Sequence, residues 1–362
     1  MIKVLSDLTK LKYKHIVKPI LFLCDAETVH NSFVKMGTVT SFIPPARWFI
    51  KTLFAYQHPS LRVEKDGISF PNPVGLSAGF DYNGQLTGIL PAVGFGFHTI
   101  GTITYEPYAG NPKPRLGRLP KSQAILVNKG LKNIGAKACV AFLQKRFAQL
   151  PVQIPTGISI GSTNKGYNSL KEQILDSLKA FSVFEKSNLP HSYYELNISC
   201  PNTYGGEPFS IPSHLELLLT CLDTMAISRP IYVKFPIDQS WEESKVLLDI
   251  ISNHCPAGVI IGNLTKDKTN PLVHPDEKNI WATKKGNLSG KPTWERSNAL
   301  IKKTRQTYKD RFTIIGTGGI FTGEDAQHKM NIGADLVQLI TGMIFEGPGA
   351  IGQINYYLGR KQ

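Results

Sequence analysis

The chain has 362 residues, of which 41% are hydrophobic and 19% are charged. This composition excludes an intrinsically disordered protein, and the length suits a single α/β barrel with a small attachment. The net charge of +14 admits nucleic acid, a membrane surface or an anionic ligand as a partner. Neither a metal-ligand spacing nor an aromatic RNA-binding pair is present, so we expect no metal site and no nucleic-acid partner.

Five cysteines are scattered along the chain, which argues against a disulfide framework and for a reducing compartment. Charges run through the first fourteen residues, so no signal peptide is predicted. The longest uncharged run, residues 82–105, holds five glycines and a proline. It is interpreted as helix, turn and strand rather than as a membrane span.

Residues 1–62 carry nine Lys or Arg residues against three acidic ones, mixed with apolar and aromatic side chains. A helix is predicted to begin near Asp25 and to end at Gly37, and an aromatic-rich stretch follows Pro44. This mixture favours a helical hairpin lying in a membrane surface, and a helical cap packed on the main domain is the alternative. We therefore expect a helical segment over residues 1–62 and a barrel over residues 63–362.

From residue 74 onward, short strand candidates alternate with amphipathic stretches. Eight such units over roughly 270 residues predict an α/β fold, the (β/α)8 TIM barrel, with its polar chemistry at the carboxyl ends of the strands. A doubly wound sheet would require a Gly-x-Gly-x-x-Gly turn after its first strand, and residues 75–81 do not supply one. The predicted strands are residues 74–79, 97–104, 157–161, 193–199, 231–235, 258–263, 312–318 and 336–341, and the clearest predicted helices are residues 170–184, 243–252, 295–307 and 325–332.

Between Tyr194 and Thr203 a predicted strand ends in a polar loop. Asn197 and Asn202 stand there on either side of a hydroxyl and the Cys200 thiol. Two carboxamides can fix a planar, amide-rich ligand, and a thiol between them can exchange a proton. The pattern is typical of one wall of an active site, but an Asx-rich turn with a buried cysteine explains this stretch equally well.

The last two predicted strands end in glycine-rich turns, at residues 316–319 and 341–342. Exposed N–H groups at such turns favour a phosphate site, as for FMN, and residues 287–292 can close over it. Tight-turn glycines without a ligand are the alternative.

Lys234 lies inside a predicted strand, where an inward-pointing lysine requires an anionic partner. A reduced flavin would be such a partner, and a lysine reaching outward to water is the alternative. Asn263 ends the sixth strand and adds a third carboxamide at the same edge.

These residues, in this order along the chain, are similar to those of a known family. The chain resembles the FMN-dependent dihydroorotate dehydrogenases over nearly its whole length. The helical extension and the segment before Arg118 are similar to the quinone-dependent, membrane-associated type (class 2), whereas the cysteine at position 200 is similar to class 1. The matching stretches are residues 77–81, 100–104, 110–119, 197–202, 233–234, 288–292, 316–319 and 336–338.

The resemblance implies oxidation of dihydroorotate to orotate in pyrimidine biosynthesis, with electrons passing through FMN to a quinone. Cys200 would take the C5 proton, and the flavin would take the hydride from C6. The resemblance also implies a peripheral contact with the cytoplasmic side of a membrane, with Arg118 near the quinone. The implied cofactor-binding residues are Ser77, Ala78, Gly79, Asp81, Gly101, Thr102, Ser159, Asn197, Lys234, Gly262, Ser289, Gly290, Gly318, Gly319, Ile340 and Thr341, and the implied substrate-binding residues are Asn128, Gly130, Leu131, Asn197, Asn202 and Asn263.

Several positions depart from the family's pattern. Serine normally occupies the base position in the quinone-dependent type, where this chain has Cys200. Tyr82 replaces a lysine, Val127 a substrate-binding asparagine, Leu264 a hydroxyl residue, and Ile340 an aromatic residue. Lost hydrogen bonds to a polar ligand are costly. Two alternatives therefore remain, namely the same flavin barrel with another cyclic amide or enone as substrate or with a soluble electron acceptor, and a non-catalytic ligand-binding barrel.

Overall fold

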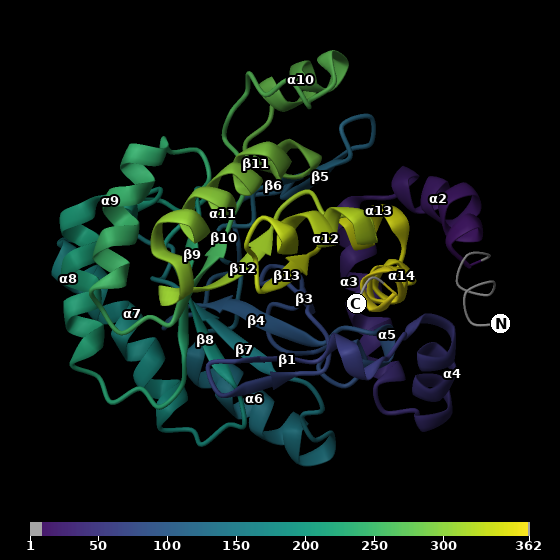
Figure 1. The fold of residues 1–362 in the computed structure, drawn as a ribbon, viewed down its shortest axis with the longest axis horizontal. Coiled ribbons are helices and arrows are strands. Elements are labelled where there is room, and N and C mark those ends of the chain that lie inside the picture. Colours follow the sequence, from purple (N-terminus) through teal and green to yellow (C-terminus); the bar gives the residue numbers. More distant parts are fainter. Residues whose placement is uncertain (1–8, 361–362) are drawn as a thin grey trace.

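A computed structural model describes residues 9–360, and its centre is a closed barrel of eight parallel strands (Figure 1). The strand order around the barrel is β10, β12, β13, β3, β4, β7, β8, β9. Each strand falls within a predicted segment or begins one residue away, so the TIM barrel is confirmed. Their bounds are β3 (Val74–Leu76), β4 (Phe97–Ile103), β7 (Thr156–Ile160), β8 (Tyr193–Asn197), β9 (Ile231–Phe235), β10 (Gly258–Ile261), β12 (Thr313–Thr317) and β13 (Leu336–Leu339).

Helices surround the barrel, which buries both faces of its strands and explains their nearly continuous apolar runs (Figure 1). Local capping fixes where several helices begin: Ser240 and Thr322 each form a capping box with the acidic residue three positions later. The four clearest predicted helices are confirmed. The helices from residue 90 onward are α5 (Leu90–Val93), α6 (Ala136–Gln149), α7 (Leu170–Glu185), α8 (Pro212–Asp223), α9 (Trp241–Ser252), α10 (Pro275–Ala282), α11 (Trp294–Tyr308), α12 (Gly323–Asn331), α13 (Thr341–Glu346) and α14 (Ala350–Gly359).

A short hairpin, β1 (Val63–Lys65) and β2 (Ile68–Phe70), closes the amino end of the barrel. Phe70 packs there with Phe97, Tyr193 and Tyr232, which lie at or near the starts of their strands, in one buried apolar cluster. A plugged amino end leaves only the carboxyl ends of the strands open to a ligand.

Above those carboxyl ends lies a second sheet that the sequence did not predict. It consists of β5 (Leu116–Leu119), β6 (Ala124–Val127) and β11 (Asn287–Gly290), paired antiparallel. The segment expected to close over a phosphate is thus an edge strand of this sheet, and it joins the barrel through the Thr265–Leu288 bridge.

The amino-terminal extension is helical over most of its described length and lies beside α13 and α14 (Figure 1). Its helix α3 continues three residues past Gly37, where an end was expected. An added Cβ at Gly37 would lie 2.6 Å from Leu86 Cδ2, so this glycine gives close packing against the barrel instead of ending the helix. The elements are a π-helical turn (Tyr13–Val17), α2 (Lys18–Leu23), α3 (Ala26–Thr40), α4 (Pro44–Phe54) and a 3-10 turn (Pro59–Leu61).

The extension exposes a concentration of large apolar side chains that the rest of the described chain lacks. Leu23 and Trp48 are the most exposed of them, at 89% and 69%. Within residues 9–360, no helix is both long enough and apolar enough to cross a membrane. The other exposed apolar residues of the extension are Leu11, Ile16, Val17, Ile20, Met36, Val39, Phe42, Ile43 and Phe49.

Candidate active site

A cavity of about 400 Å³ begins among the helices of the extension and reaches the carboxyl ends of the barrel strands. Phe22, His30 and Phe33 line it on the extension side, and Cys200 and Lys234 line it on the barrel side. Its walls are mostly apolar. The extension and the residues predicted to carry the chemistry therefore line the same cavity.

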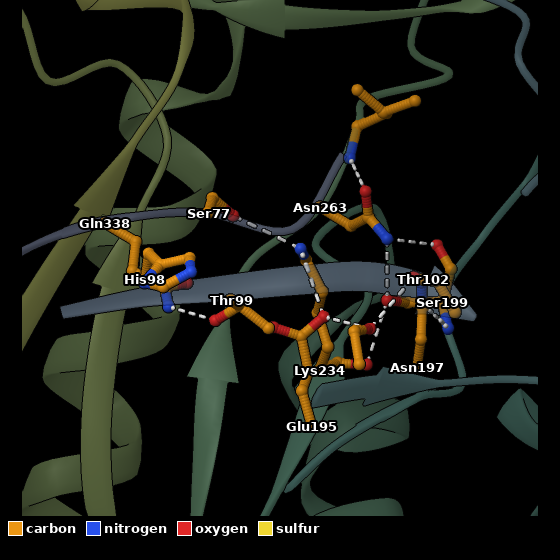
Figure 2. A network of polar contacts seen from close by, with 12 residues as sticks. Ser77, His98, Thr99, Thr102, Glu195, Asn197, Ser199, Lys234, Asn263 and Gln338 are labelled. Carbon is orange, nitrogen blue, oxygen red and sulfur yellow. Dashed lines mark hydrogen bonds and ion pairs between the residues drawn. The ribbon is translucent and has the colours of Figure 1, made fainter. Parts of the chain in front are cut away.

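At the barrel side of the cavity, a group of buried polar residues forms what we call the inner site: Lys234, Glu195, Ser77, Ser159 and Thr102. Lys234 Nζ lies 3.5 Å from Glu195 Oε1 and 3.3 Å from Ser77 Oγ (Figure 2). Ser159 donates to the same Glu195 oxygen at 2.7 Å, and Thr102 lies 2.9 Å from Ser159. The lysine thus points inward, and its charge is compensated within the protein.

Cys200 follows β8 on the same wall, held by the surrounding carboxamides. Asn263 donates to the carbonyl oxygen and the hydroxyl of Ser199, at 2.8 and 2.9 Å, which fixes the loop beside Cys200 (Figure 2). Burial raises the pKa of the Cys200 thiol to about 11, while the nearby Lys234 opposes this shift. The thiol is therefore almost fully protonated at neutral pH in the ligand-free protein.

Of the four predicted substrate carboxamides, Asn197, Asn202 and Asn263 line the cavity, and Asn128 does not. Asn197 donates to Thr102 Oγ1 at 2.8 Å, and Asn202 donates to the Val127 carbonyl oxygen at 3.1 Å. A carboxamide has two donor hydrogens and two acceptor lone pairs, so Asn197 and Asn202 each keep capacity for a ligand. Asn263 already directs both amide hydrogens at Ser199 and keeps acceptor capacity only.

A second, smaller cavity adjoins the first and is lined by the predicted glycine turns. Gly318 and Gly319 have φ values of +94° and +72°, and a Cβ at Gly318 would lie 2.6 Å from Thr293 Oγ1. The backbone at these two glycines packs closely against its neighbours because no side chain intervenes. A phosphate-binding turn requires a backbone that can be approached in this way. Together with buried Lys234, which lines both cavities, the donor set fits FMN, whose phosphate would lie at the glycines.

Most of the predicted site residues line one or both cavities. Three do not. Asp81 is buried, and its carboxylate accepts hydrogen bonds from the N–H groups of residues 84–86, which shapes that turn. Ser159 contributes through Glu195, and Asn128 accepts from Asn111 Nδ2 at 2.9 Å. The lining residues among the predictions are Ser77, Ala78, Gly79, Gly101, Thr102, Arg118, Gly130, Leu131, Asn197, Cys200, Asn202, Lys234, Gly262, Asn263, Ser289, Gly290, Gly318, Gly319, Ile340 and Thr341.

The positions that depart from the family's pattern also lie along the larger cavity. Tyr82, Val127 and Leu264 all line it. The Tyr82 ring lies 5.4 Å from His30 of the extension and 5.2 Å from Lys129 Nζ. Burial lowers the pKa of His30 to about 4, with repulsion by Lys129 adding to it, so this ring is uncharged at neutral pH.

Four charged residues beside Tyr82, here called the mouth cluster, are Glu27, Lys129, Lys132 and Arg115. Lys129 Nζ lies 2.7 Å from Glu27 Oε1, Arg115 Nη1 lies 3.3 Å from it, and Lys132 Nζ lies 3.7 Å from it. Lys129 and Lys132 line the cavity.

The sequence reasoning missed Glu195 and the whole mouth cluster. Glu195 carried a signal, because a carboxylate within an otherwise apolar strand requires a buried partner. The alternation of β8 and β9 could have paired it with Lys234. Nothing in the sequence brings Glu27 to Lys129, because 102 residues separate them.

Comparison with known proteins agrees with this geometry. A sequence model of the dihydroorotate dehydrogenase family matches residues 60–361. The chain is 34% identical over 354 residues to a dihydroorotate dehydrogenase (quinone) of Cyanothece sp. strain PCC 7425, covering 94% of this chain and 93% of that relative. It is 36% identical over 323 residues to the protein of the same name from Synechococcus sp. strain JA-2-3B'a(2-13), covering 86% and 82%.

Solved structures give the same result. The ligand-free DHODH from Eimeria tenella superimposes with a TM-score of 0.78 at 26% identity, over 91% of this chain and 93% of that one. Its complex with ferulenol gives a TM-score of 0.75, over 92% and 90% of the two chains. With a family match across most of the chain and the same barrel beneath it, the chain belongs to the dihydroorotate dehydrogenase family.

Proposed function

We propose that this protein oxidises dihydroorotate to orotate and passes the electrons to a quinone. The observation that supports this most is the continuous cavity, which joins Cys200 and Lys234 to the apolar helices of the extension. A polar substrate can bind at the barrel side of such a cavity, and an apolar electron acceptor can enter through the extension.

In the proposed reaction, dihydroorotate loses a proton from C5 and a hydride from C6. The Cys200 thiolate takes the proton, and the carboxamides of Asn197, Asn202 and Asn263 hold the pyrimidine ring. FMN, when bound, would supply the acceptor for the hydride and would pass the electrons on to the quinone. Lys234 favours the anionic form of the reduced cofactor, and Glu195 keeps the lysine in place before that charge arrives.

Anaerobic titration of the FMN-loaded protein with dihydroorotate tests the proposal. We expect the flavin absorbance to bleach and then to return when a soluble quinone is added. A flavin that stays oxidised in excess dihydroorotate would contradict the substrate. A flavin that bleaches but is reoxidised only by a soluble acceptor such as fumarate would contradict the quinone.

The apolar wall supports a second candidate, a flavin oxidoreductase that acts on another cyclic amide or enone. Tyr82, Val127 and Leu264 offer fewer polar contacts than the family's pattern provides, and a pocket built in this way accepts a less polar ring. Anaerobic bleaching by a panel of dihydropyrimidines and cyclic enones separates the candidates. Faster reduction by a neutral ring than by dihydroorotate would favour the second candidate.

We further propose that the extension rests on the cytoplasmic side of a membrane. Its exposed apolar side chains are interspersed with lysines, as on helices that bind an anionic lipid surface. The full chain should sediment with anionic lipid vesicles, and replacing both Trp48 and Phe49 by Ser should weaken this binding. Unchanged sedimentation of that variant would contradict the contact.

Removal of residues 1–62 tests what the extension contributes. Quinone turnover should fall more than flavin reduction by dihydroorotate, because the apolar side of the cavity is lost. Equal loss in both half-reactions would instead indicate a structural cap.

A further inference from the structure

The mouth cluster carries more positive than negative charge. Within residues 9–360, Glu27 is the one carboxylate at ion-pair distance from Lys129, Lys132 or Arg115. Three cations therefore share a single anion. At the inner site, by contrast, Lys234 has Glu195 to itself. The mouth cluster thus contributes surplus positive charge to the cavity through Lys129 and Lys132.

This surplus is held where water does not fully screen it. The side chains of Glu27 and Lys129 are each 7% exposed, that of Arg115 14%, and that of Lys132 34%. Burial lowers the pKa of Lys129, and Glu27 opposes that shift by holding the ammonium charge. A buried cation without full compensation is costly, and a ligand anion removes that cost when it binds.

Lys129 also has donors to spare. Its ammonium group has three hydrogens, of which one is directed at Glu27. Its loop follows β6, and the backbone is fixed by the bond from Asn111 N to the Lys129 carbonyl oxygen at 3.2 Å. The aromatic ring of Tyr82 lies under the ammonium group. The charge is thus positioned by the fold before any ligand arrives.

We propose that Lys129, assisted by Lys132, binds the carboxylate of the substrate at the mouth of the cavity. This rests on the proposed function, in which the substrate is a pyrimidine carboxylate. Tyr82 occupies the position of the family's lysine and supplies no charge, so Lys129 provides the cation from a different loop. Glu27 is a positioning residue in this arrangement, and through it the extension helps to build the substrate site.

Binding of orotate and of uracil to the full-length, FMN-loaded protein tests the proposal, because uracil is the same ring without the carboxylate. In Lys129→Met, the aliphatic stem is kept and the charge is removed. We expect orotate to bind about 10- to 100-fold more weakly, as for a lost charge-assisted hydrogen bond. Uracil binding and FMN content should stay within about twofold, a change smaller than a typical hydrogen bond contributes. The readout is the change in flavin absorbance on titration.

Lys121→Met is the matched control, because this lysine pairs with Asp276 on the surface and does not line the cavity. It should bind both ligands like the wild type. If Lys129→Met weakens the binding of orotate and uracil equally, or weakens the binding of neither, the anion site is refuted. If Lys129→Met does not retain FMN, Lys132→Met decides, since its more exposed side chain tolerates the change. We expect a loss of about two- to fivefold for orotate alone, and no loss in Lys132→Met would refute the proposal.

Failure of the proposed function would look different. In that case the wild type would neither bind orotate nor be bleached by dihydroorotate. The same titration is then made with benzoate and benzamide, which differ in charge at one group. A preference for benzoate that Lys129→Met abolishes would preserve the anion site for another carboxylate substrate, and the absence of such a preference would refute it.

Discussion

The inner site and the mouth cluster lie in one cavity but balance their charges in different ways. At the inner site, Lys234 meets Glu195, and the Ser159 hydroxyl donates to the same carboxylate oxygen. At the mouth, three cations share Glu27. The inner site is thus close to neutral before a ligand binds, as suits a resident cofactor whose charge changes during turnover. The mouth is suited to an anion that enters and leaves.

The largest expected effect comes from removing the Cys200 thiol. Cys200→Ala should slow flavin reduction by dihydroorotate by about 10²- to 10⁴-fold, because a general base contributes about that much. FMN should remain bound, since its cradle lies on other strands. Stopped-flow reduction under anaerobic conditions measures the rate. Cys255→Ala, at an exposed cysteine, is the control, and reduction by Cys200→Ala at the wild-type rate would rule the thiol out as the base.

Removing the negative charge of the inner site should mainly lower the stability of the protein. Glu195→Gln leaves Lys234 buried without a counter-charge, and such a change costs about 3 to 5 kcal/mol in the free energy of unfolding. Denaturant titration of the FMN-free protein measures this. Glu106→Gln removes the partner of Lys165 in a pair whose side chains are 50% and 34% exposed, and it should cost at most about 1 kcal/mol. Equal losses in the two variants would mean that the inner pair contributes no more than a surface pair.

The pH dependence of flavin reduction tests whether the Cys200 thiolate is the base. Burial raises the pKa of Cys200 to about 11, so the thiolate that acts as base becomes more abundant as pH rises towards that value. Between pH 7 and 9.5 the rate should rise by nearly a factor of ten per pH unit. Single-turnover reduction at saturating dihydroorotate measures the slope. A plateau that begins near pH 8 would show that the thiol is more acidic than its burial implies.

The smallest effect concerns how the extension docks at the mouth. In Gly37→Ala the new methyl group meets the Leu86 side chain, and overpacking costs about 1 to 3 kcal/mol. The higher helix propensity of alanine offsets about 1 kcal/mol of this overpacking cost. Ser32→Ala, at an exposed position of the same helix, raises helix propensity without a new contact to the barrel, and it also removes the bond from the Ser32 hydroxyl to the Thr28 carbonyl oxygen. Thermal unfolding measures both variants, and a Gly37→Ala protein more stable than Ser32→Ala would contradict close packing at this glycine.

The barrel was predictable because its signals are local. Each strand is a short and mostly apolar run, as in Tyr193–Asn197 and Thr313–Thr317. Parallel strands buried on both faces require such runs, so pattern alone located them. The second sheet was not predictable in the same way, because β6 and β11 pair across more than 150 residues, and polar side chains interrupt β5 and β11.

For the site, sequence patterns were enough to predict which groups gather at the carboxyl ends of the strands: Cys200, Lys234 and the carboxamides. The barrel topology brings the carboxyl ends of its parallel strands together, independently of the side chains there. Tertiary structure alone decided the partners of the charges. Glu195 faces Lys234 because their strands are neighbours in the barrel, and Glu27 reaches Lys129 because the extension folds back over the mouth. Electrostatic compensation depends on distance in space, and distance along the chain does not reveal it.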